Sequence, residues 1–185
     1  RLIKNLMCNI KLRNFKIKDI NNVYIRALNN KKLMQFSENR FRLFNKKNCL
    51  EFFKSMKKNK NFFFLASKQN KHDNLEIPVG TLTGYVDYNN KICDLGILIW
   101  ENQKGYGQIA WQIAIDKIFE KNYVRKITAG TMANNKAMIK LFKKSSMKFE
   151  LKKKKTFIYK NSFVDMIGYS IFKNEYKKKK SLYFK

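Results

Sequence analysis

The chain has 185 residues, and 41 Lys and Arg against 13 Asp and Glu give it a formal net charge of +28. The length is typical of one domain, and 44% hydrophobic residues exclude an intrinsically disordered chain. One histidine excludes multi-histidine metal sites, the widely spaced Cys8, Cys49 and Cys93 exclude a disulfide scaffold, and no apolar run reaches the ~20 residues of a membrane span. We therefore expect a reduced, cytoplasmic protein without a bound metal.

The basic charge comes mostly from lysine. The chain has 35 Lys but only 6 Arg, together with 22 Asn. Surfaces that bind nucleic acids favour Arg, because its planar guanidinium binds phosphate and guanine bidentately. High Lys and Asn together are typical of an AT-rich genome. We therefore interpret blocks such as Lys152–Lys155 and Lys177–Lys180 as solvated surface and expect no specific nucleic-acid partner.

The first third of the chain predicts one strand and two helices. Ile10–Lys16 alternates apolar and basic residues, which predicts a strand. Asp19 is a suitable N-cap for a helix over Ile20–Leu28. Lys46–Lys58 places apolar residues on one side and predicts a second helix. The chain starts at Arg1, so we expect that its natural start lies upstream.

Two strands and a hairpin turn follow. Phe62–Ser67 and Ile77–Asp87 predict strands, separated by the polar loop Lys68–Glu76, in which we interpret His72 as a surface residue. The pair Asn89-Asn90 is a hairpin turn signal. These two strands are therefore expected to precede a further antiparallel strand.

A strand, a glycine turn and a helix come next. Lys91–Trp100 is a nearly continuous apolar run, which predicts a strand covered on both faces. The glycine-bearing segment Glu101–Gln108 follows it, and Ile109–Lys121 then predicts an amphipathic helix. Glycines let backbone approach a ligand closely, and the first turn of a helix favours an anion. Gly105 and Gly107 therefore suggest a phosphate site; the alternative is a turn that binds nothing.

The last third predicts a strand over Lys126–Met132, a helix over Lys136–Lys144, and two long strands, Met147–Tyr159 and Ser162–Phe172, joined at Lys160-Asn161. The whole order predicts a mixed α/β sheet with one parallel crossover at its centre. We expect a single domain over residues 1–185, with a core at about 10–173 and a basic tail at 174–185.

Five segments appear in an order and spacing that resemble the GNAT superfamily of acetyl-CoA-dependent N-acetyltransferases. They are Leu95–Trp100, Lys104–Gly107, Lys126–Thr131, Asn134–Lys144 and Lys148–Glu150. The chain looks closest to the branch of ribosomal-protein N-terminal acetyltransferases and amino-sugar-nucleotide acetyltransferases. The resemblance implies the GNAT fold, a mixed and mostly antiparallel central sheet flanked by about four helices.

The resemblance also implies a set of residues that bind acetyl-CoA as co-substrate. The family's pyrophosphate loop maps onto Asn102–Gly107, with Asn102 where relatives carry Gln or Arg. The strand before that loop pairs with the pantetheine arm, and the asparagine after the next strand maps to Asn135, or to Asn134 in a shifted register. Either asparagine could instead cap the following helix. The implied residues are Ile97, Leu98, Ile99, Asn102, Gln103, Lys104, Gly105, Tyr106, Gly107, Gln108, Asn134, Asn135 and Phe142.

The proton-transfer residues are less well defined by the resemblance. Phe142 falls where many relatives carry the tyrosine that protonates the CoA thiolate. Tyr159, Tyr169 and Ser145 are possible replacement acids, and nothing in the sequence selects one of them; Tyr159 is taken as the candidate. The alternative is that water protonates the thiolate. Asp94 falls where relatives of this branch often carry Glu, so it is the candidate base; the alternative is that Asp94 pairs with a lysine.

The resemblance implies transfer of an acetyl group to a primary amine by direct attack. Ser37–Phe41 fits a Ser-x-x-Arg-Phe run of the amino-sugar enzymes, which implies that Arg40 binds the acceptor and favours an amino-sugar nucleotide. The alternatives are a protein N-terminal amine, or a non-catalytic basic protein that binds nucleic acid. We expect a small-molecule amine as partner, no membrane, and a monomer or homodimer.

Overall fold

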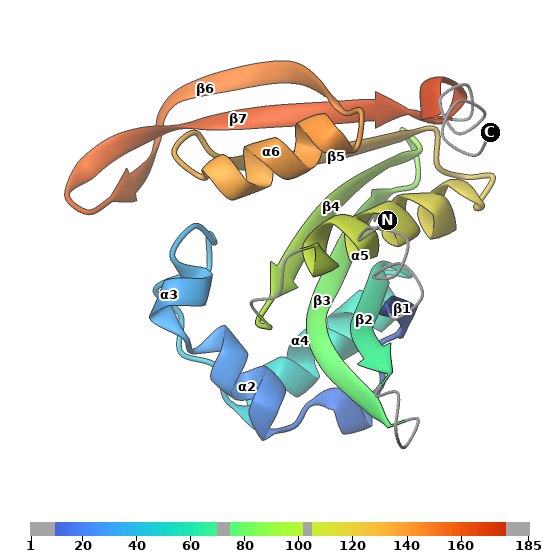
Figure 1. Cartoon of the computed structure of the whole chain (residues 1–185), viewed down its shortest axis with the longest axis vertical. Coiled ribbons are helices and arrows are strands. Elements are labelled where there is room, and N and C mark those ends of the chain that lie inside the picture. The colour runs from blue at the N-terminus through green and yellow to red at the C-terminus, as the bar shows by residue number, and fades with distance from the viewer. Residues whose placement is uncertain (1–9, 70–74, 102–104, 177–185) are drawn as a thin grey trace. The chain divides into compact units, whose positions relative to one another are not determined.

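The computed structural model describes residues 10–69, 75–101 and 105–176. Seven strands in this part of the chain form one mixed sheet in the order β1-β2-β3-β4-β5-β7-β6 (Figure 1). The chain divides into two compact units. The first contains the described residues up to Tyr85 together with Ile97–Ala114; the second contains Val86–Gly96 and the described residues from Ile115 onward. Each unit thus contains part of the sheet.

The elements follow one another along the chain as β1 (Ile10–Asn14), η1 (Ile17–Asp19), α2 (Asn22–Leu28), α3 (Lys31–Met34), α4 (Lys46–Lys58), β2 (Phe62–Gln69), β3 (Glu76–Asp87), β4 (Ile92–Ile99), α5 (Tyr106–Phe119), β5 (Lys126–Met132), α6 (Lys136–Lys144), β6 (Lys148–Tyr159) and β7 (Ser162–Phe172). One further helical turn covers residues 173–176.

The predicted architecture is confirmed. α4, β5, α6 and β7 have the predicted bounds. β4 pairs with β5 in parallel, which is the expected crossover, and the other pairings described are antiparallel. The β6–β7 turn falls at the predicted Lys160-Asn161, where both residues have positive φ, 47° and 59°, as a two-residue hairpin turn requires.

Three helix predictions need correction. Asp19 does not cap a helix from Ile20; α2 begins at Asn22, and the Asn21 side chain caps it by accepting from the N–H groups of residues 23 and 24. Besides the four helices predicted, the described residues contain η1, the short α3 and the helical turn at residues 173–176, none of which was predicted. α5 begins at Tyr106 rather than at Ile109.

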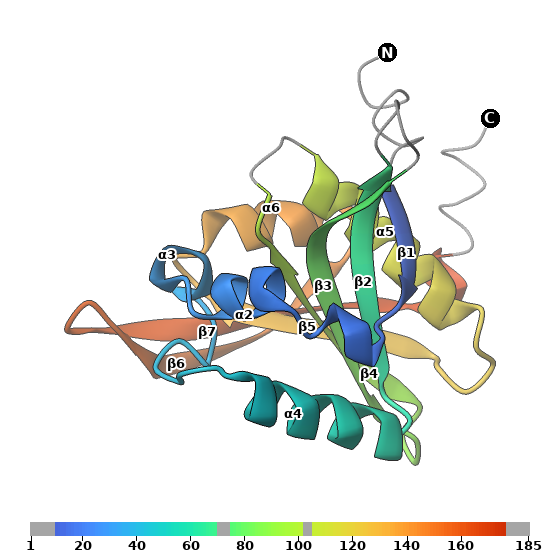
Figure 2. The ribbon, with the colours of Figure 1, turned by 90° about the horizontal axis from the view of Figure 1, so that it is seen from below.

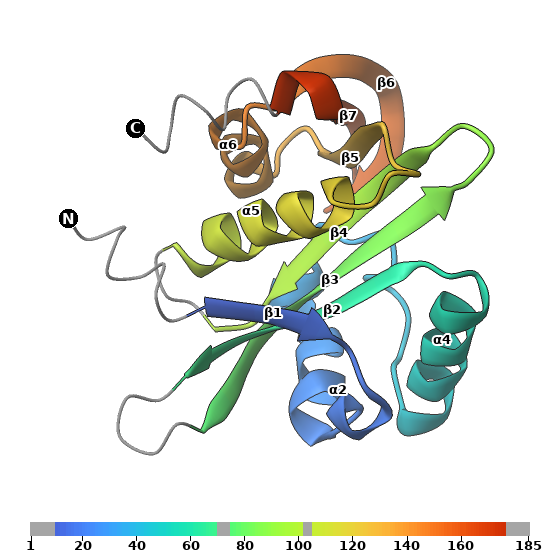
Figure 3. The ribbon, with the colours of Figure 1, turned by 90° about the vertical axis from the view of Figure 1, so that its right-hand side faces the viewer.

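An aromatic core holds the first unit together. The rings of Phe15 and Phe63 stack with centroids 4.0 Å apart, and Tyr24 packs on Phe15 at 5.0 Å. Cys49 and Met56 of α4 join this cluster. In Figure 3, α2 and α4 accordingly lie on one side of β1–β3, and the beginning of α5 lies on the other. Strands β1–β3 therefore have a helix on each face.

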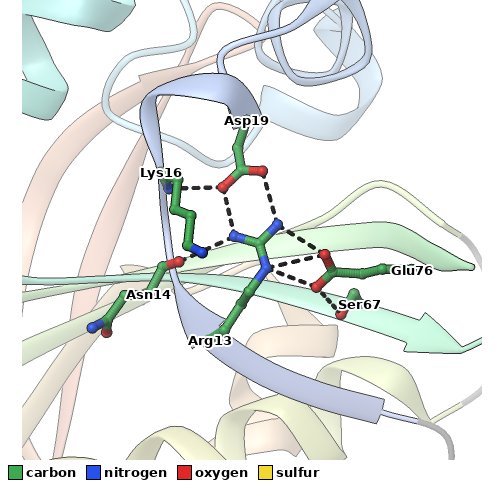
Figure 4. A network of polar contacts seen from close by, with 6 residues as sticks. All are labelled: Arg13, Asn14, Lys16, Asp19, Ser67 and Glu76. Atoms are coloured by element: carbon green, nitrogen blue, oxygen red, sulfur yellow. Dashed lines mark hydrogen bonds and ion pairs between the residues drawn. The ribbon is translucent and has the colours of Figure 1, made fainter.

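Arg13 of β1 connects three elements of the first unit (Figure 4). Its guanidinium donates to both carboxylate oxygens of Asp19 at 2.7 and 2.8 Å, and to Glu76 of β3 at 2.8 to 3.0 Å. Asp19 also accepts from the Lys16 N–H at 2.7 Å, and the Ser67 hydroxyl donates to Glu76 at 2.9 Å. These bonds explain why Asp19 is not a helix cap: its carboxylate is already engaged.

The network shifts the titration of both carboxylates. Burial opposes ionisation of Asp19, but hydrogen bonds from Arg13 and from the Lys16 N–H outweigh it, so the Asp19 pKa lies below its ordinary value. The hydrogen bond from Arg13 lowers the pKa of Glu76 as well. Both groups are therefore carboxylates at neutral pH.

The second unit is built on β5, β7 and β6, with α6 beside them (Figure 1). Phe142 of α6 is fully buried, and its ring lies 5.1 Å from that of Tyr169 on β7. The long β6–β7 hairpin extends well beyond α6 (Figure 2). β6 is the edge strand, and its lysines Lys152–Lys155 are exposed, as the sequence predicted. No helix in the described part of the chain is long and apolar enough to cross a membrane.

Candidate functional site

The end of β4 is fixed by the neighbouring strand β3. The Trp100 indole N–H donates to the Pro78 carbonyl at 3.0 Å. The backbone N–H groups of Trp100 and Glu101 both donate to the Val79 carbonyl, at 3.0 and 3.4 Å. Two successive donors on one carbonyl are the pattern of a β-bulge, which bends a strand and ends its regular pairing. β4 thus ends at a defined point immediately before the glycine segment.

Ile97, Leu98 and Ile99 are the last three residues of β4, and all three are half-buried. Sequence analysis expected both faces of this strand to be covered, and the structure covers them only in part. Cys93 and Leu95 are buried, whereas the last three residues keep apolar surface in contact with solvent. Apolar strand residues left partly open next to a glycine turn are a feature of binding sites rather than of a closed core.

Gly80 of β3 is a site residue that sequence analysis missed. A Cβ at this position would lie 2.5 Å from the Leu98 carbonyl oxygen and 2.3 Å from Cδ1 of Ile99. Only glycine therefore lets β3 approach the end of β4 this closely. An isolated glycine inside a strand pattern is the sequence signal for such an approach.

Gly105 and Gly107 have different roles. Gly105 has φ of 104°, a conformation that L side chains rarely adopt, and its carbonyl accepts the N–H of Ile109 at 3.1 Å. It is therefore the residue that turns the chain into α5. Among the described residues, a Cβ on Gly107 would meet only Cγ1 of Ile99, at an ordinary 3.6 Å, so these residues leave the position open. Asn102, Gln103 and Lys104 lie outside the described residues.

Tyr106 and Gln108 lie in the first turn of α5. Tyr106 is buried, with 5% of its surface exposed, and Gln108 is half-buried. Lys68 of β2 contacts this region: its ammonium is ion-paired with Glu101 and lies 5.8 Å from the centroid of the Tyr106 ring. The hydrogen bond from Lys68 to Glu101 raises the Lys68 pKa, so the ammonium stays charged. Sequence analysis placed Lys68 in a polar loop and did not identify this contact.

In the second unit, Asn135 caps α6. Its side-chain oxygen accepts the Met138 N–H at 3.2 Å, and its amide donates to the Thr131 hydroxyl at 2.9 Å. The capping alternative is thus realised by Asn135, whereas Asn134 is exposed. A contact of Asn135 with a cofactor remains a prediction beside this structural role.

Phe142, for which a contact with the cofactor is predicted, lies in the core of the second unit, and the contact stays a prediction. The side chain has no exposed surface and packs on Tyr169. It is a core residue of the second unit, because a phenyl ring on the inner face of an amphipathic helix is stabilised by burial. Two of the alternative acids, Tyr169 and Ser145, are also buried, at 7% and 2% exposure.

The structure does not bring Asp94 and Tyr159 together. Asp94 accepts a hydrogen bond from Thr128 of β5 at 2.8 Å, and Thr128 pairs with Ser170 of β7. Tyr159 pairs with Ser162 at the other end of β7. Ser170 and Ser162 are eight residues apart, which is ~26 Å along a strand. The two residues therefore cannot act on one substrate atom across this part of the sheet.

Arg40, the expected acceptor residue, lies in an exposed segment between α3 and α4. Its guanidinium donates to the Ser37 carbonyl at 3.0 Å and lies 4.4 Å over the Phe41 ring. The Arg42 guanidinium lies 5.6 Å over the Phe44 ring. Phe41 and Leu43 are 82% and 77% exposed. The segment thus contains two arginine–aromatic pairs, in which Phe41 and Arg42 are exposed and Arg40 and Phe44 are half-buried.

Two other groups have no catalytic geometry. Burial raises the pKa of the Cys93 thiol to about 12, so Cys93 is an inert core residue rather than a nucleophile. In the described ranges, no group of three or more His, Cys, Asp or Glu side chains is placed to hold a metal ion. His72 lies outside the described residues.

Known proteins were compared with the chain. The model of the acetyltransferase (GNAT) domain family matches residues 9–148. No sequence among the curated proteins matches significantly. The structure of spermidine N-acetyltransferase from Vibrio cholerae, determined with CoA and spermine, is similar over 92% of this chain and 99% of its own, with 16% identity and a TM-score of 0.80.

Two further structures share the fold. RimL, the ribosomal L7/L12 alpha-N-protein acetyltransferase in complex with CoA, matches with 14% identity, a TM-score of 0.76, and coverage of 89% of this chain and 94% of its own. The putative acetyltransferase YncA from Salmonella typhimurium with acetyl-CoA matches with 12% identity, a TM-score of 0.75, and coverage of 90% and 95%. With a family model that spans most of its length, the chain belongs to the GNAT family of N-acetyltransferases.

Proposed function

We propose that this protein transfers the acetyl group of acetyl-CoA to a primary amine by direct attack, and that the amine is carried by an anionic small molecule such as an amino-sugar nucleotide. Acetyl transfer is supported by one arrangement in the first unit. The half-buried strand end Ile97–Ile99 is followed by Gly105, which has a positive φ, and by Gly107, where the described residues leave space. Membership of the GNAT family supports the same reaction.

These residues fit the chemistry of the donor. A pyrophosphate is favoured at the first turn of a helix, and Gly105 directs the chain into α5 at that turn. A ligand can approach the backbone at Gly107, because the described residues leave space there. The apolar surface of Ile97–Ile99 suits a pantetheine arm lying along the strand edge. Relatives of similar fold were determined with CoA or acetyl-CoA bound.

In the proposed reaction the neutral amine nitrogen attacks the thioester carbonyl carbon. The C–N bond forms, the C–S bond breaks, and the sulfur leaves as thiolate while the amine proton passes to water or to a base. A backbone N–H in the stretch Ile97–Ile99 would stabilise the carbonyl oxygen as it gains charge. A thiol has a pKa near 8.5, so water can protonate the thiolate without the tyrosine that Phe142 replaces.

The exposed segment around Arg40 supports an anionic acceptor. Arginine binds phosphates bidentately, and exposed aromatic rings stack on nucleobases. Arg40 and Arg42 with Phe41 offer both groups within three residues. A polyamine acceptor is disfavoured, because it would have to approach a chain of net charge +28.

Donor binding can be tested by thermal unfolding and calorimetry. Acetyl-CoA should stabilise the protein in a saturable way, by about 2.7 kcal/mol at a concentration one hundredfold above its Kd. Gly107→Val should remove this stabilisation by blocking the open position, while Gly107→Ala should fold normally. ATP at the same concentration and physiological salt is the control. Equal stabilisation by ATP would show that charge alone is responsible and would contradict the proposed site.

Acceptor choice can be tested by following release of the CoA thiol. Three amines should be compared at equal concentration: an amino-sugar nucleotide, spermidine, and a peptide with a free N-terminal amine. The proposal expects the highest kcat/KM for the nucleotide, and a loss of about tenfold or more in Arg40→Gln for this substrate alone. Preference for spermidine or the peptide would overturn the acceptor while leaving the acyl transfer intact.

A further inference from the structure

We propose that Asn29, at the end of α2, is a positioning residue for the amine substrate. It holds the acceptor segment, residues 37–44, in one form and so sets the affinity for the acceptor. This inference rests on the proposed function, because Arg40 and Arg42 of that segment are assigned there to the acceptor. It adds a residue outside the Ser37–Phe41 run on which the acceptor assignment is based.

The Asn29 side chain binds the backbone of Phe44 twice. Its Nδ2 donates to the Phe44 carbonyl at 2.8 Å, and its Oδ1 accepts the Phe44 N–H at 2.8 Å. The two residues are 15 positions apart, so the contact closes a loop that contains α3 and Arg40. A donor and an acceptor that bind the same residue are the pattern of a hydrogen-bonded pair between antiparallel strands. The Asn29 amide thus supplies the pairing that a neighbouring strand would give.

Asn48 completes this arrangement from the first turn of α4. Its Nδ2 donates to the Leu43 carbonyl at 3.0 Å, and its Oδ1 accepts the Asn45 N–H at 3.0 Å. The two asparagines together bind four successive backbone groups, from the Leu43 carbonyl to the Asn45 N–H. A different backbone conformation here would break these hydrogen bonds. The end of the acceptor segment is therefore fixed by two helices.

Both sides of the Asn29–Phe44 contact have firm support in the first unit. The Asn29 N–H donates to the Ile25 carbonyl at 3.1 Å, which keeps Asn29 on the end of α2. The half-buried Phe44 side chain packs against the aromatic core, as do Ile25 and Leu28 of α2. α2 and α4 lie on the same side of β1–β3 (Figure 3). Since the Arg42 guanidinium lies over the Phe44 ring, fixing Phe44 also fixes the position of this charge.

The expected effect is on acceptor affinity. Without Asn29, binding of the acceptor would have to order the segment, and this ordering lowers affinity. Donor binding and the chemical step should not change, because Asn29 contacts neither the strand end Ile97–Ile99 nor the first turn of α5 in the described part of the chain. Local opening of the segment should also expose the peptide bonds after Arg40 and Arg42 to a protease.

The other end of α2 offers a matched control. The Asn21 side chain accepts the N–H groups of Val23 and Tyr24 at 3.0 and 3.1 Å. Asn21→Ala thus removes two hydrogen bonds between a side chain and the backbone, as Asn29→Ala does. None of the bonds lost in Asn21→Ala involves the acceptor segment.

The first experiment digests the native full chain with an arginine-specific protease and follows cleavage after Arg40 and Arg42 by mass spectrometry. The chain has only 6 Arg, so few other sites compete. We expect Asn29→Ala to be cut at these two sites roughly tenfold faster than the parent protein, because two hydrogen bonds that oppose opening are lost. Asn21→Ala should be cut there at the rate of the parent protein.

The second experiment measures steady-state kinetics with the amino-sugar nucleotide and calorimetry with acetyl-CoA. We expect Asn29→Ala to raise the KM for the nucleotide by roughly tenfold, with kcat changed by less than about twofold and the Kd for acetyl-CoA unchanged. Asn21→Ala should leave all three values unchanged.

Three results would overturn the inference. Cleavage of Asn29→Ala at the parent rate would show that the segment keeps its form without this contact. Faster cleavage with an unchanged KM would show that the form of the segment does not set acceptor affinity. Equal changes in Asn21→Ala would reduce the effect to general stability. If the parent protein prefers spermidine or the peptide, the proposed acceptor fails by itself; the digestion and the KM for the preferred amine then still decide the role of Asn29.

Discussion

The Arg13 network of the first unit and the β6 lysines of the second unit accommodate charge in different ways. In the first, Arg13 lies between Asp19 and Glu76, and its side chain and that of Asp19 are only 26% and 8% exposed. In the second, Lys148 and Lys152 of β6 form ion pairs in which the lysines are 67% and 52% exposed. One of the few arginines thus occupies the position where several acceptors must be satisfied at once, since a guanidinium has five donors in a fixed plane.

The lysines of the second unit have a different consequence. β6 is the edge strand of the sheet, and exposed lysines on an edge oppose pairing with another chain. Its pairing with β7 shifts register between Lys153 and Phe157, and Lys155 there has φ of 50°. Lysine-rich sequence is therefore tolerated where it protects an edge, while a single half-buried arginine connects β1, η1 and β3. Substitutions in the two units should separate these two uses of charge.

The largest effect is expected for Arg13→Met. The substitution leaves the buried carboxylate of Asp19 and the exposed carboxylate of Glu76 without their guanidinium, which should lower the free energy of unfolding by about 3 kcal/mol, mostly through Asp19. Denaturant unfolding followed by circular dichroism measures this change. If the free energy of unfolding falls by less than about 1 kcal/mol, the network stabilises the protein no more than a surface ion pair does.

The same network predicts how stability responds to acid. The pKa values of Asp19 and Glu76 are lowered in the folded protein, so their contribution is complete above the ordinary values of about 3.9 and 4.3 and is lost as pH falls through the folded values. The parent protein should therefore lose its stability advantage over Arg13→Met below pH ~4. An advantage that persists at pH 2 would contradict this assignment.

A smaller effect is expected for Gly80→Ala in the first unit. The added Cβ collides with the Leu98 carbonyl oxygen, which cannot move without the strand, so about 2 kcal/mol should be lost together with acetyl-CoA binding. Gly130→Ala in the second unit is the control. Its Cβ would lie 2.3 Å from Cε of Met166, the end of a flexible side chain, which can move away. Equal losses in both variants would refute the distinction.

Asn135→Ala should lower stability by about 1 kcal/mol, because it removes the side-chain cap of α6. Asn134→Ala, at an exposed position, should have no measurable effect. Calorimetry with acetyl-CoA on both variants then tests the predicted second role. If Asn135→Ala loses more acetyl-CoA affinity than its lower stability explains, a cofactor contact is supported. If its affinity for acetyl-CoA is unchanged, Asn135 acts only as a helix cap.

The smallest effect is expected for Lys148→Met. The Lys148–Glu175 pair joins two exposed side chains at 2.6 Å, and such pairs add little in water. Its unfolding curve should coincide with that of the parent protein. A loss as large as that of Arg13→Met would show that the two units do not differ in their use of charge.

The sequence alone determined where most elements lie. The bounds of α4, β5, α6 and β7, the turn at Lys160-Asn161 and the parallel crossover follow from periodicity and from turn chemistry, which depend on neighbours a few residues away. The family resemblance also depends on local sequence, because each motif that carries it, such as the glycine segment, is continuous along the chain. Where a side chain was already engaged by another group, as the Asp19 carboxylate is by Arg13, the prediction of a helix cap was wrong.

Only the tertiary structure decided which side chains meet. Arg13 and Glu76 are 63 residues apart, and Lys68 and Glu101 are 33 apart, so no local pattern connects them. The closeness of Gly80 to Leu98, the burial of Phe142 and the separation of Asp94 from Tyr159 likewise depend on strand register. Register fixes neighbours across a sheet through backbone hydrogen bonds, and periodicity along one strand carries no record of the strand beside it.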